Sequence, residues 1–202
     1  MIVKVCGMKY QDNIMEVDKL KVDIIGFIFH EKSPRFISKK PDCLPVNAKR
    51  AGVFVDTDIN DIIEKAQLFS LDIIQLHGNE SPETCRILKN IGFEVIKAFH
   101  AEKENIKTLT YRYEGLCKYF LFDTPCKEMG GSGKRFDWSL LQNYSGSTPF
   151  LLSGGISLND IPDIKKFRHN MMAGVDINSG FEISPGIKNA YEISNFINCL
   201  KL

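Results

Sequence analysis

Short hydrophobic runs recur along the whole chain and alternate with stretches that have the spacing of amphipathic helices. The runs are continuous rather than alternately hydrophobic and polar, which is typical of strands covered on both faces. They predict eight strands, at residues 2–6, 24–29, 51–55, 73–76, 94–99, 119–122, 150–152 and 172–175.

The segments between these runs are predicted to be mostly helical. Ser81 before Pro82 indicates an N-cap followed by proline at the first helical position, and Asp58 or Thr57 is expected to cap a helix through Ala66. Further helices are expected at residues 14–20, 102–111, 138–142, 157–167 and 185–200. Residues 38–49 contain two prolines, which helices tolerate only near their start, so the second helix is expected to be brief or irregular.

Eight strand–helix units in 202 residues fit the lower size limit of a closed (β/α)8 barrel, the TIM barrel. An open, doubly wound sheet is the alternative, and it would need no eighth unit. No repeat, low-complexity tract or linker divides the chain. We therefore expect residues 1–202 to form a single (β/α)8-barrel domain.

Composition narrows the range of partners. Lysine plus arginine number 26 against 25 acidic residues, and this near-neutral balance argues against binding to nucleic acid or to an anionic membrane. No signal peptide is expected, and the hydrophobic runs are too short to span a bilayer. The six cysteines are scattered and lack the spacing of a zinc or redox motif, which favours a reducing cytoplasm.

Residues able to carry chemistry gather just after the predicted strands. In a barrel these positions share one rim, and that rim carries the active site. Cys6 ends the first strand, where it is either a buried thiol or a thiolate that acts as base or nucleophile. Asp123 follows the sixth strand, and no predicted helix begins close enough for it to cap. A carboxyl group across a barrel mouth from a thiol would form an acid–base pair.

Three glycine-rich turns indicate that the ligand carries a phosphate. They comprise residues 130–134, Ser153-Gly154-Gly155, and residues 176–180 after the eighth strand. Turns after strands seven and eight are the recurrent phosphate site of this barrel class. The first turn lacks the spacing of the ATP-binding P-loop. A small phosphorylated substrate is therefore predicted.

Two further side chains are candidates for the same rim. Arg35 lies in a proline-stiffened loop after strand two and is suited to a bidentate grip on a carboxylate. His77 ends strand four and is as consistent with a structural histidine as with a functional one. No group of His, Cys, Asp and Glu has the local spacing of a metal site, so no metal is expected.

In order along the chain, these segments resemble the phosphoribosylanthranilate isomerase family of tryptophan biosynthesis. The matching segments are Lys4-Val5-Cys6-Gly7-Met8, residues 26–36, 52–55 and 75–78, Asp123 with residues 130–136, and residues 152–156 and 174–186. They span nearly the entire chain.

The resemblance implies a cofactor-free barrel that converts N-(5-phosphoribosyl)anthranilate into 1-(2-carboxyphenylamino)-1-deoxyribulose 5-phosphate, an Amadori rearrangement. It implies that Cys6 is the general base, Asp123 the general acid, and Arg35 the residue that holds the anthranilate carboxylate. The implied phosphate site consists of backbone groups of Gly131, Ser132, Gly133, Gly154, Gly155, Ser179 and Gly180. His77 and Asp176 match family positions and are expected to contact substrate. A monomer or a homodimer is expected.

Two other classes of function are alternatives: another phosphosugar barrel enzyme, and a phosphate-binding barrel without catalysis. A histidine-pathway isomerase would be expected to have a carboxylate at the position of Cys6, and an indole-forming synthase would need lysine and glutamate at strand ends. Lys4 and Lys97 lie in strands, but the rest of that pattern is missing. A phosphate-binding barrel without catalysis is disfavoured because cysteine, aspartate and arginine occur together.

Overall fold

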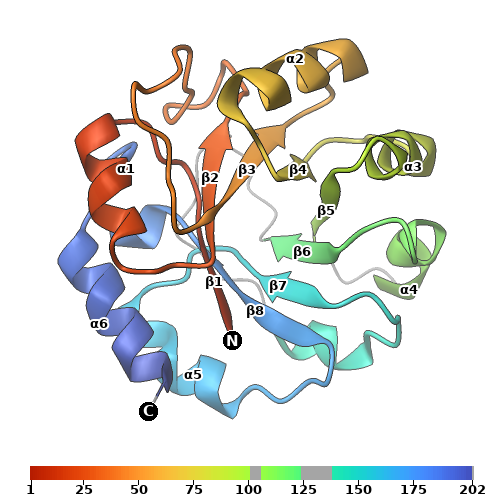
Figure 1. Cartoon of the computed structure of the whole chain (residues 1–202). Helices are drawn as coiled ribbons and strands as arrows, with labels where there is room; N and C mark the ends of the chain where they lie inside the picture. Colours follow the sequence, from red (N-terminus) through yellow and green to blue (C-terminus); the bar gives the residue numbers. More distant parts are fainter. Residues whose placement is uncertain (101–105, 124–137, 202) are drawn as a thin grey trace.

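Eight parallel strands form a closed barrel in the computed structural model, which describes residues 1–100, 106–123 and 138–201 (Figure 1). The barrel strands are β1 (Ile2–Val5), β2 (Ile24–Ile28), β3 (Lys49–Phe54), β4 (Ile73–Leu76), β5 (Glu94–His100), β6 (Tyr119–Asp123), β7 (Phe150–Leu152) and β8 (Met172–Ile177). Each strand pairs with the next along the chain, and β8 pairs with β1 from Ile2–Gly174 to Val5–Ile177. This last pairing closes the barrel, so the predicted (β/α)8 architecture is confirmed and the open sheet is excluded.

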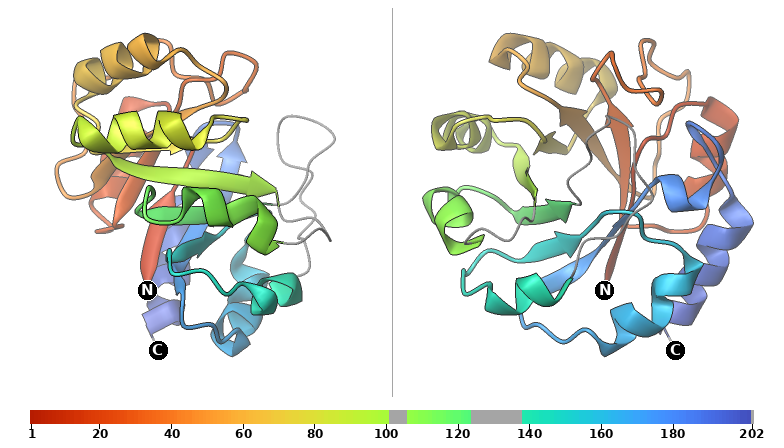
Figure 2. Two further views of the ribbon diagram at one scale, coloured as in Figure 1. Left: turned by 90° about the vertical axis from the view of Figure 1, so that its right-hand side faces the viewer. Right: turned by 180° about the vertical axis from the view of Figure 1, so that it is seen from behind.

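Helices cover the outside of the barrel, as both views in Figure 2 show. The α-helices are α1 (Gln11–Asp18), α2 (Ile59–Phe69), α3 (Pro82–Asn90), α4 (Ile106–Thr110), α5 (Ile161–Lys166) and α6 (Ala190–Lys201). The 3₁₀ segments are η1 (Tyr111–Tyr113), η2 (Trp138–Asn143), η3 (Leu158–Asp160) and η4 (Ser179–Phe181). No helix of the described residues is long and apolar enough to cross a membrane.

Local capping explains where two of the helices begin. Asp58 accepts a hydrogen bond from the backbone N–H of Asn60 at the start of α2. Ser81 accepts one from the backbone N–H of Thr84, and Pro82 occupies the first turn of α3. Both N-caps are the side chains that the sequence pattern indicates.

The link between β2 and β3 contains no helix, so the prediction of a short or irregular second helix is wrong. Asp18, at the end of α1, explains how this segment is held instead. Its carboxylate accepts hydrogen bonds from the backbone N–H groups of Val46, Asn47 and Ala48. A buried carboxylate thus satisfies backbone donors that a helix would otherwise have paired.

The last predicted helix begins too early. Residues before it form a small hairpin of β9 (Glu182–Ser184) and β10 (Ile187–Lys188), and α6 starts only at Ala190. Gly186 takes a φ of +86° at the turn, and Asn13 of α1 bonds both the backbone N–H and the carbonyl of Lys188. These contacts join residues 175 positions apart, beyond the reach of local helical spacing.

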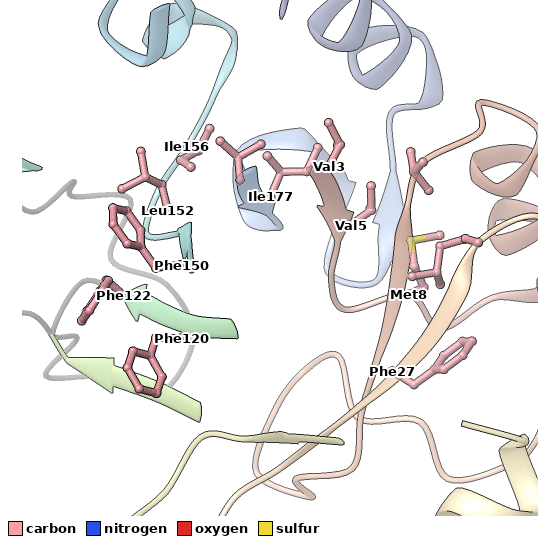
Figure 3. Close-up of a cluster of buried hydrophobic side chains, with 14 of the residues drawn as sticks. Val3, Val5, Met8, Phe27, Phe120, Phe122, Phe150, Leu152, Ile156 and Ile177 are labelled. Carbon is pink, nitrogen blue, oxygen red and sulfur yellow. The ribbon is translucent and has the colours of Figure 1, made fainter. Parts of the chain in front are cut away.

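Hydrophobic packing occurs in two layers because successive side chains of a strand point to opposite faces. The larger cluster lies between strands and helices, and Figure 3 shows Phe120, Phe122 and Phe150 gathered within it. Val3 and Val5 of β1 belong to this outer cluster. Lys4 lies between them in the sequence and therefore points to the barrel interior. A smaller apolar cluster fills that interior, formed by Ile24, Ala51, Ile73, Ile96, Ala98, Leu121 and Leu151.

Candidate active site

The candidate side chains come from strands on different sides of the barrel and lie at its carboxyl-terminal end. Cys6 directly follows β1, His77 directly follows β4, Asp123 ends β6, and Asp176 lies near the end of β8. Since the barrel strands are parallel, these four positions share the rim at which barrel enzymes carry their active sites.

His77 and Asp123 are in direct contact. Nε2 of His77 lies 3.3 Å from Oδ2 of Asp123, and both side chains are about one quarter exposed, at 23% and 26%. Nδ1 of His77 lies 3.1 Å from the amide Nε2 of Gln75. The imidazole of His77 is therefore held between the Gln75 amide on one side and Asp123 on the other. Asp123 is thereby oriented at the open end of the barrel.

Cys6 is more deeply placed, with only 4% of its surface exposed. Its backbone N–H donates to the carbonyl of Ile177, which ties the end of β1 to β8. Burial raises the pKa of the Cys6 thiol, and the nearby Lys4 ammonium opposes that rise. Cys6 therefore has a fixed position and a cationic neighbour.

Lys4 and Asp176 form a buried ion pair next to Cys6. Nζ of Lys4 lies 2.8 Å from Oδ1 of Asp176, with side-chain exposures of 0% and 6%. Burial alone would lower the pKa of Lys4, but Asp176 and Cys6 together outweigh burial and raise it, so Lys4 stays an ammonium. Sequence reasoning placed Asp176 at the rim but gave Lys4 no role in this site.

Asp176 connects the two candidate catalytic side chains electrostatically. Its carboxyl group interacts with Lys4, Asp123 and His77, and the Cys6 thiol in turn interacts with Asp176. Burial raises the pKa of Asp176, which the Lys4 charge opposes. Cys6 and Asp123 therefore border the same mouth of the barrel, each within electrostatic range of one carboxyl group.

Arg35 is buried and pairs with a carboxylate of the protein itself. Its Nε lies 2.9 Å from Oε1 of Glu182, and its Nη2 lies 2.6 Å from Oε2. Lys188 donates to the same Glu182, at 2.6 Å, and to Oδ1 of Asn178, also at 2.6 Å. Burial opposes ionisation of Glu182, but these two cations outweigh it and lower the pKa of this carboxyl group. Sequence reasoning missed Glu182, although this charged residue lies only two positions after the last glycine motif.

Gly7 brings Arg35 close to the end of β1. It adopts a φ of +75°, and a Cβ atom there would lie 2.7 Å from both Cδ of Arg35 and Oδ1 of Asn178. Only glycine permits this conformation and this approach without strain. The turn after β1, the loop after β2 and the loop after β8 thus converge beside Cys6.

The turns after β7 and β8 also meet. Gly154 and Gly155 have φ values of +90° and +66°, so the backbone curls directly after β7. A Cβ on Gly180 would collide with the carbonyl oxygen of Ile156, which shows how closely the two turns pack. Ser179 precedes Gly180 in η4. Gly131, Ser132 and Gly133 lie outside the described residues.

The described residues contain no group of three or more His, Cys, Asp or Glu side chains that could hold a metal ion. The described residues at this rim supply a thiol, a carboxyl–imidazole pair and buried cations. These groups suit proton transfer and the binding of an anionic ligand.

A closed (β/α)8 barrel whose ionisable side chains converge at the carboxyl ends of its strands defines a barrel enzyme. Comparison with known proteins identifies its family. Residues 3–199 match the family model of N-(5'-phosphoribosyl)anthranilate (PRA) isomerase, and the chain belongs to this family. It is an isomerase of tryptophan biosynthesis.

Individual members of this family match the chain over nearly its whole length. The chain is 52% identical over 204 residues to N-(5'-phosphoribosyl)anthranilate isomerase of Parabacteroides distasonis, covering 98% of this chain and 92% of that protein. A solved phosphoribosyl anthranilate isomerase in complex with reduced 1-(o-carboxyphenylamino)-1-deoxyribulose 5-phosphate is 28% identical, with a TM-score of 0.79 and coverage of 100% and 99%. Monomers generated from the dimeric enzyme of Thermotoga maritima give a TM-score of 0.82 at 28% identity, again covering 100% and 99%.

Proposed function

We propose that this chain converts N-(5-phosphoribosyl)anthranilate into 1-(2-carboxyphenylamino)-1-deoxyribulose 5-phosphate with Asp123 as general acid and Cys6 as general base. The observation that carries the proposal is the shared barrel mouth. Cys6 after β1 and Asp123 at the end of β6 both lie within electrostatic range of Asp176. An acid and a base placed around one opening can act on the same small substrate.

Asp123 would perform the first proton transfer. The ring oxygen of the ribose is a poor leaving group until it is protonated, so a carboxylic acid must deliver a proton as the ring opens to an iminium. Asp123 is partly exposed and oriented by His77, at 3.3 Å. Such a proton transfer contributes roughly 10²–10⁴-fold to the rate.

Cys6 would perform the second transfer. Formation of the iminium makes the neighbouring C2–H bond acidic, and a thiolate on the opposite side removes that proton. The C–H bond breaks, an S–H bond forms, and the electron pair stays on the substrate as an enolamine. The enolamine then tautomerises to the ketone product.

Two anchors would hold the substrate between these groups. Among the described residues, the guanidinium hydrogen bonds of Arg35 leave from Nε and Nη2, both to Glu182. Nη1 is then available for the anthranilate carboxylate. Backbone groups of Gly154, Gly155, Ser179 and Gly180, together with residues 131–133, would bind the phosphate, and His77 and Asp176 would contact the ribose chain. Fixing both ends of the substrate orients the reacting carbons between acid and base.

The remaining features of the proposal concern the whole protein. Residues 1–202 form one catalytic domain that needs no cofactor and works in the cytoplasm. It acts as a monomer or a homodimer, and the dimeric Thermotoga maritima relative supports the second state. Its partner is a small phosphorylated molecule, which the complex of a relative with a reduced product analogue supports.

Steady-state kinetics of two variants tests the assignment of acid and base. Cys6→Ser and Asp123→Asn should each abolish the loss of phosphoribosylanthranilate fluorescence, because each removes one proton-transfer group while nearly preserving shape. Cys85→Ser, at another buried thiol, and Asp61→Asn, on the exposed side of α2, serve as matched controls and should retain activity. Near-normal kcat in either site variant would remove that residue from the mechanism.

A further inference from the structure

Lys4 lies beside the sulfur of Cys6 because a glycine faces both side chains. A Cβ atom on Gly26 of β2 would lie 3.0 Å from Sγ of Cys6 and 3.4 Å from Nζ of Lys4. The sulfur and the ammonium nitrogen therefore approach the same point from β1. Asp176 of β8 holds the ammonium from the other side, at 2.8 Å.

A thiol in this position needs help to act as a base. The thiolate is the basic form, and an apolar, water-poor environment disfavours any charged form. Cys6 is 4% exposed, and burial raises the pKa of its thiol. Without a compensating positive charge, only a small fraction of the enzyme would carry the thiolate at neutral pH.

We propose that Lys4 is a positioning residue whose buried ammonium, held by Asp176, stabilises the thiolate of Cys6 beside it. The proposal rests on the proposed role of Cys6 as general base. Lys4 keeps its proton throughout the cycle, and the proton taken from the substrate resides on sulfur. Asp176 has an opposing effect, because it fixes Lys4 in place but its own negative charge disfavours the thiolate.

The other charged groups around Cys6 do not replace Lys4. Lys188 of β10 also favours the thiolate, as a weaker contributor than Lys4. Its Nζ is bound to Asn178 and to Glu182, both at 2.6 Å. Arg35 also pairs with Glu182, with its Nη2 at 2.6 Å from Oε2. Lys4 is thus the cation of the described residues that shares the immediate surroundings of the sulfur.

The ionisation of Cys6 can be measured without turnover. Protein labelled with ¹³C at the cysteine Cβ is titrated by NMR, and the Cys6 resonance is assigned from Cys6→Ala. Lys4→Met alone would leave the buried Asp176 unpaired and endanger folding. The informative set is therefore wild type, Asp176→Asn, and the charge-free pair Lys4→Met/Asp176→Asn.

The proposal predicts an order of the three thiol pKa values. Asp176→Asn should titrate below wild type, because the opposing negative charge is gone. Lys4→Met/Asp176→Asn should titrate above wild type and about 1–3 pH units above Asp176→Asn, the usual effect of losing an adjacent opposite charge. Equal pKa values in the two variants would overturn the proposal, and so would an Asp176→Asn value at or above that of wild type.

A second buried lysine provides the control. Lys97 of β5 is 2% exposed and paired with Glu80 at 3.2 Å, but it donates to the backbone of Gly78 and does not adjoin Cys6. Lys97→Met should leave the Cys6 titration unchanged, even if stability falls. The titration reports the effect of Lys4 on the Cys6 thiol without requiring turnover, so its outcome can be separated from that of the kinetic test of Cys6. An active Cys6→Ser enzyme would refute the base assignment, whereas an unchanged titration would refute only the role of Lys4.

Discussion

At the scale of single residues, buried carboxylates organise the loops that surround the site. Asp18 is 1% exposed and accepts hydrogen bonds from three consecutive backbone N–H groups of the loop before β3. Asp18→Ala leaves these donors without a partner. We expect the free energy of unfolding at pH 7, measured with urea, to fall by about 2–4 kcal/mol.

The same substitution should show a defined pH dependence. Burial of Asp18 favours its neutral form, but the backbone hydrogen bonds outweigh burial and lower the pKa of its carboxyl group. A lowered folded-state pKa gives stability that is complete above the unfolded pKa, near 4, and is lost as pH falls through the folded value. The difference between wild type and Asp18→Ala should thus shrink below about pH 4. An undiminished difference at pH 3 would contradict this account.

Glu182 should matter both for stability and for substrate binding. Glu182→Ala leaves Arg35 and Lys188 as buried cations without their shared carboxylate, at a cost of about 3–5 kcal/mol in the free energy of unfolding. Loss of this partner also frees the Arg35 guanidinium to rotate, so KM should rise more than kcat falls. Both effects are measured by urea unfolding and by steady-state kinetics.

An exposed ion pair provides the control for Glu182. Lys49 and Glu94 lie 2.8 Å apart, with side chains 53% and 32% exposed. Glu94→Ala should cost less than about 1 kcal/mol, because water screens such pairs, and it should leave KM unchanged. If Glu94→Ala changed the free energy of unfolding and KM as much as Glu182→Ala does, Glu182 would not be the residue that holds Arg35 for substrate binding.

At the scale of elements, the contact between the turns after β7 and β8 should set affinity for the phosphate. Gly180→Ala forces the new methyl group against the carbonyl of Ile156 and separates these turns. KM should rise at least about tenfold, equivalent to about 1.4 kcal/mol, and inorganic phosphate should inhibit more weakly. Gly115→Ala serves as the control: its φ of +72° strains the backbone locally, but it precedes β6, at the opposite end of the barrel, and should leave both quantities unchanged. An unaltered KM for Gly180→Ala would exclude these turns from the phosphate site.

The sequence predicts strands better than it predicts the segments between them. All eight barrel strands occur where continuous hydrophobic runs indicate them, since burial on both faces leaves a strong local pattern. Residues 185–189 also have a plausible helical pattern, yet β10 forms there because Asn13 binds the backbone of Lys188. The loop before β3 is held by Asp18 in the same way. Local spacing carries no information about such distant partners.

In the candidate site, too, the sequence indicates the residues with a local signal and misses those defined by a distant partner. Cys6, His77, Asp123 and Asp176 could be found because each follows or ends a hydrophobic run, and barrel topology then brings such positions together. The sequence pattern indicates no role for Lys4, because this residue lies inside a strand and its partner Asp176 is 172 residues away along the chain.

At the scale of the whole molecule, closure of the barrel creates the site. The β1–β8 pairing joins the first strand to the last, and the Lys4–Asp176 ion pair lies across that junction. Cys6 therefore gains its charged surroundings only when the barrel is complete. His77 and Asp123 come from β4 and β6, on other strands of the same ring. The site thus depends on the closed ring rather than on any one strand–helix unit.

The most direct test of the acid–base account is a crystal structure of this chain with reduced 1-(2-carboxyphenylamino)-1-deoxyribulose 5-phosphate bound. The account predicts Sγ of Cys6 and a carboxylate oxygen of Asp123 on opposite sides of the sugar chain, with the sulfur within about 4 Å of C2. The phosphate should lie at the turns after β7 and β8. A bound ligand that contacts only one of these two side chains, or whose sugar chain lies away from the barrel mouth, would contradict it.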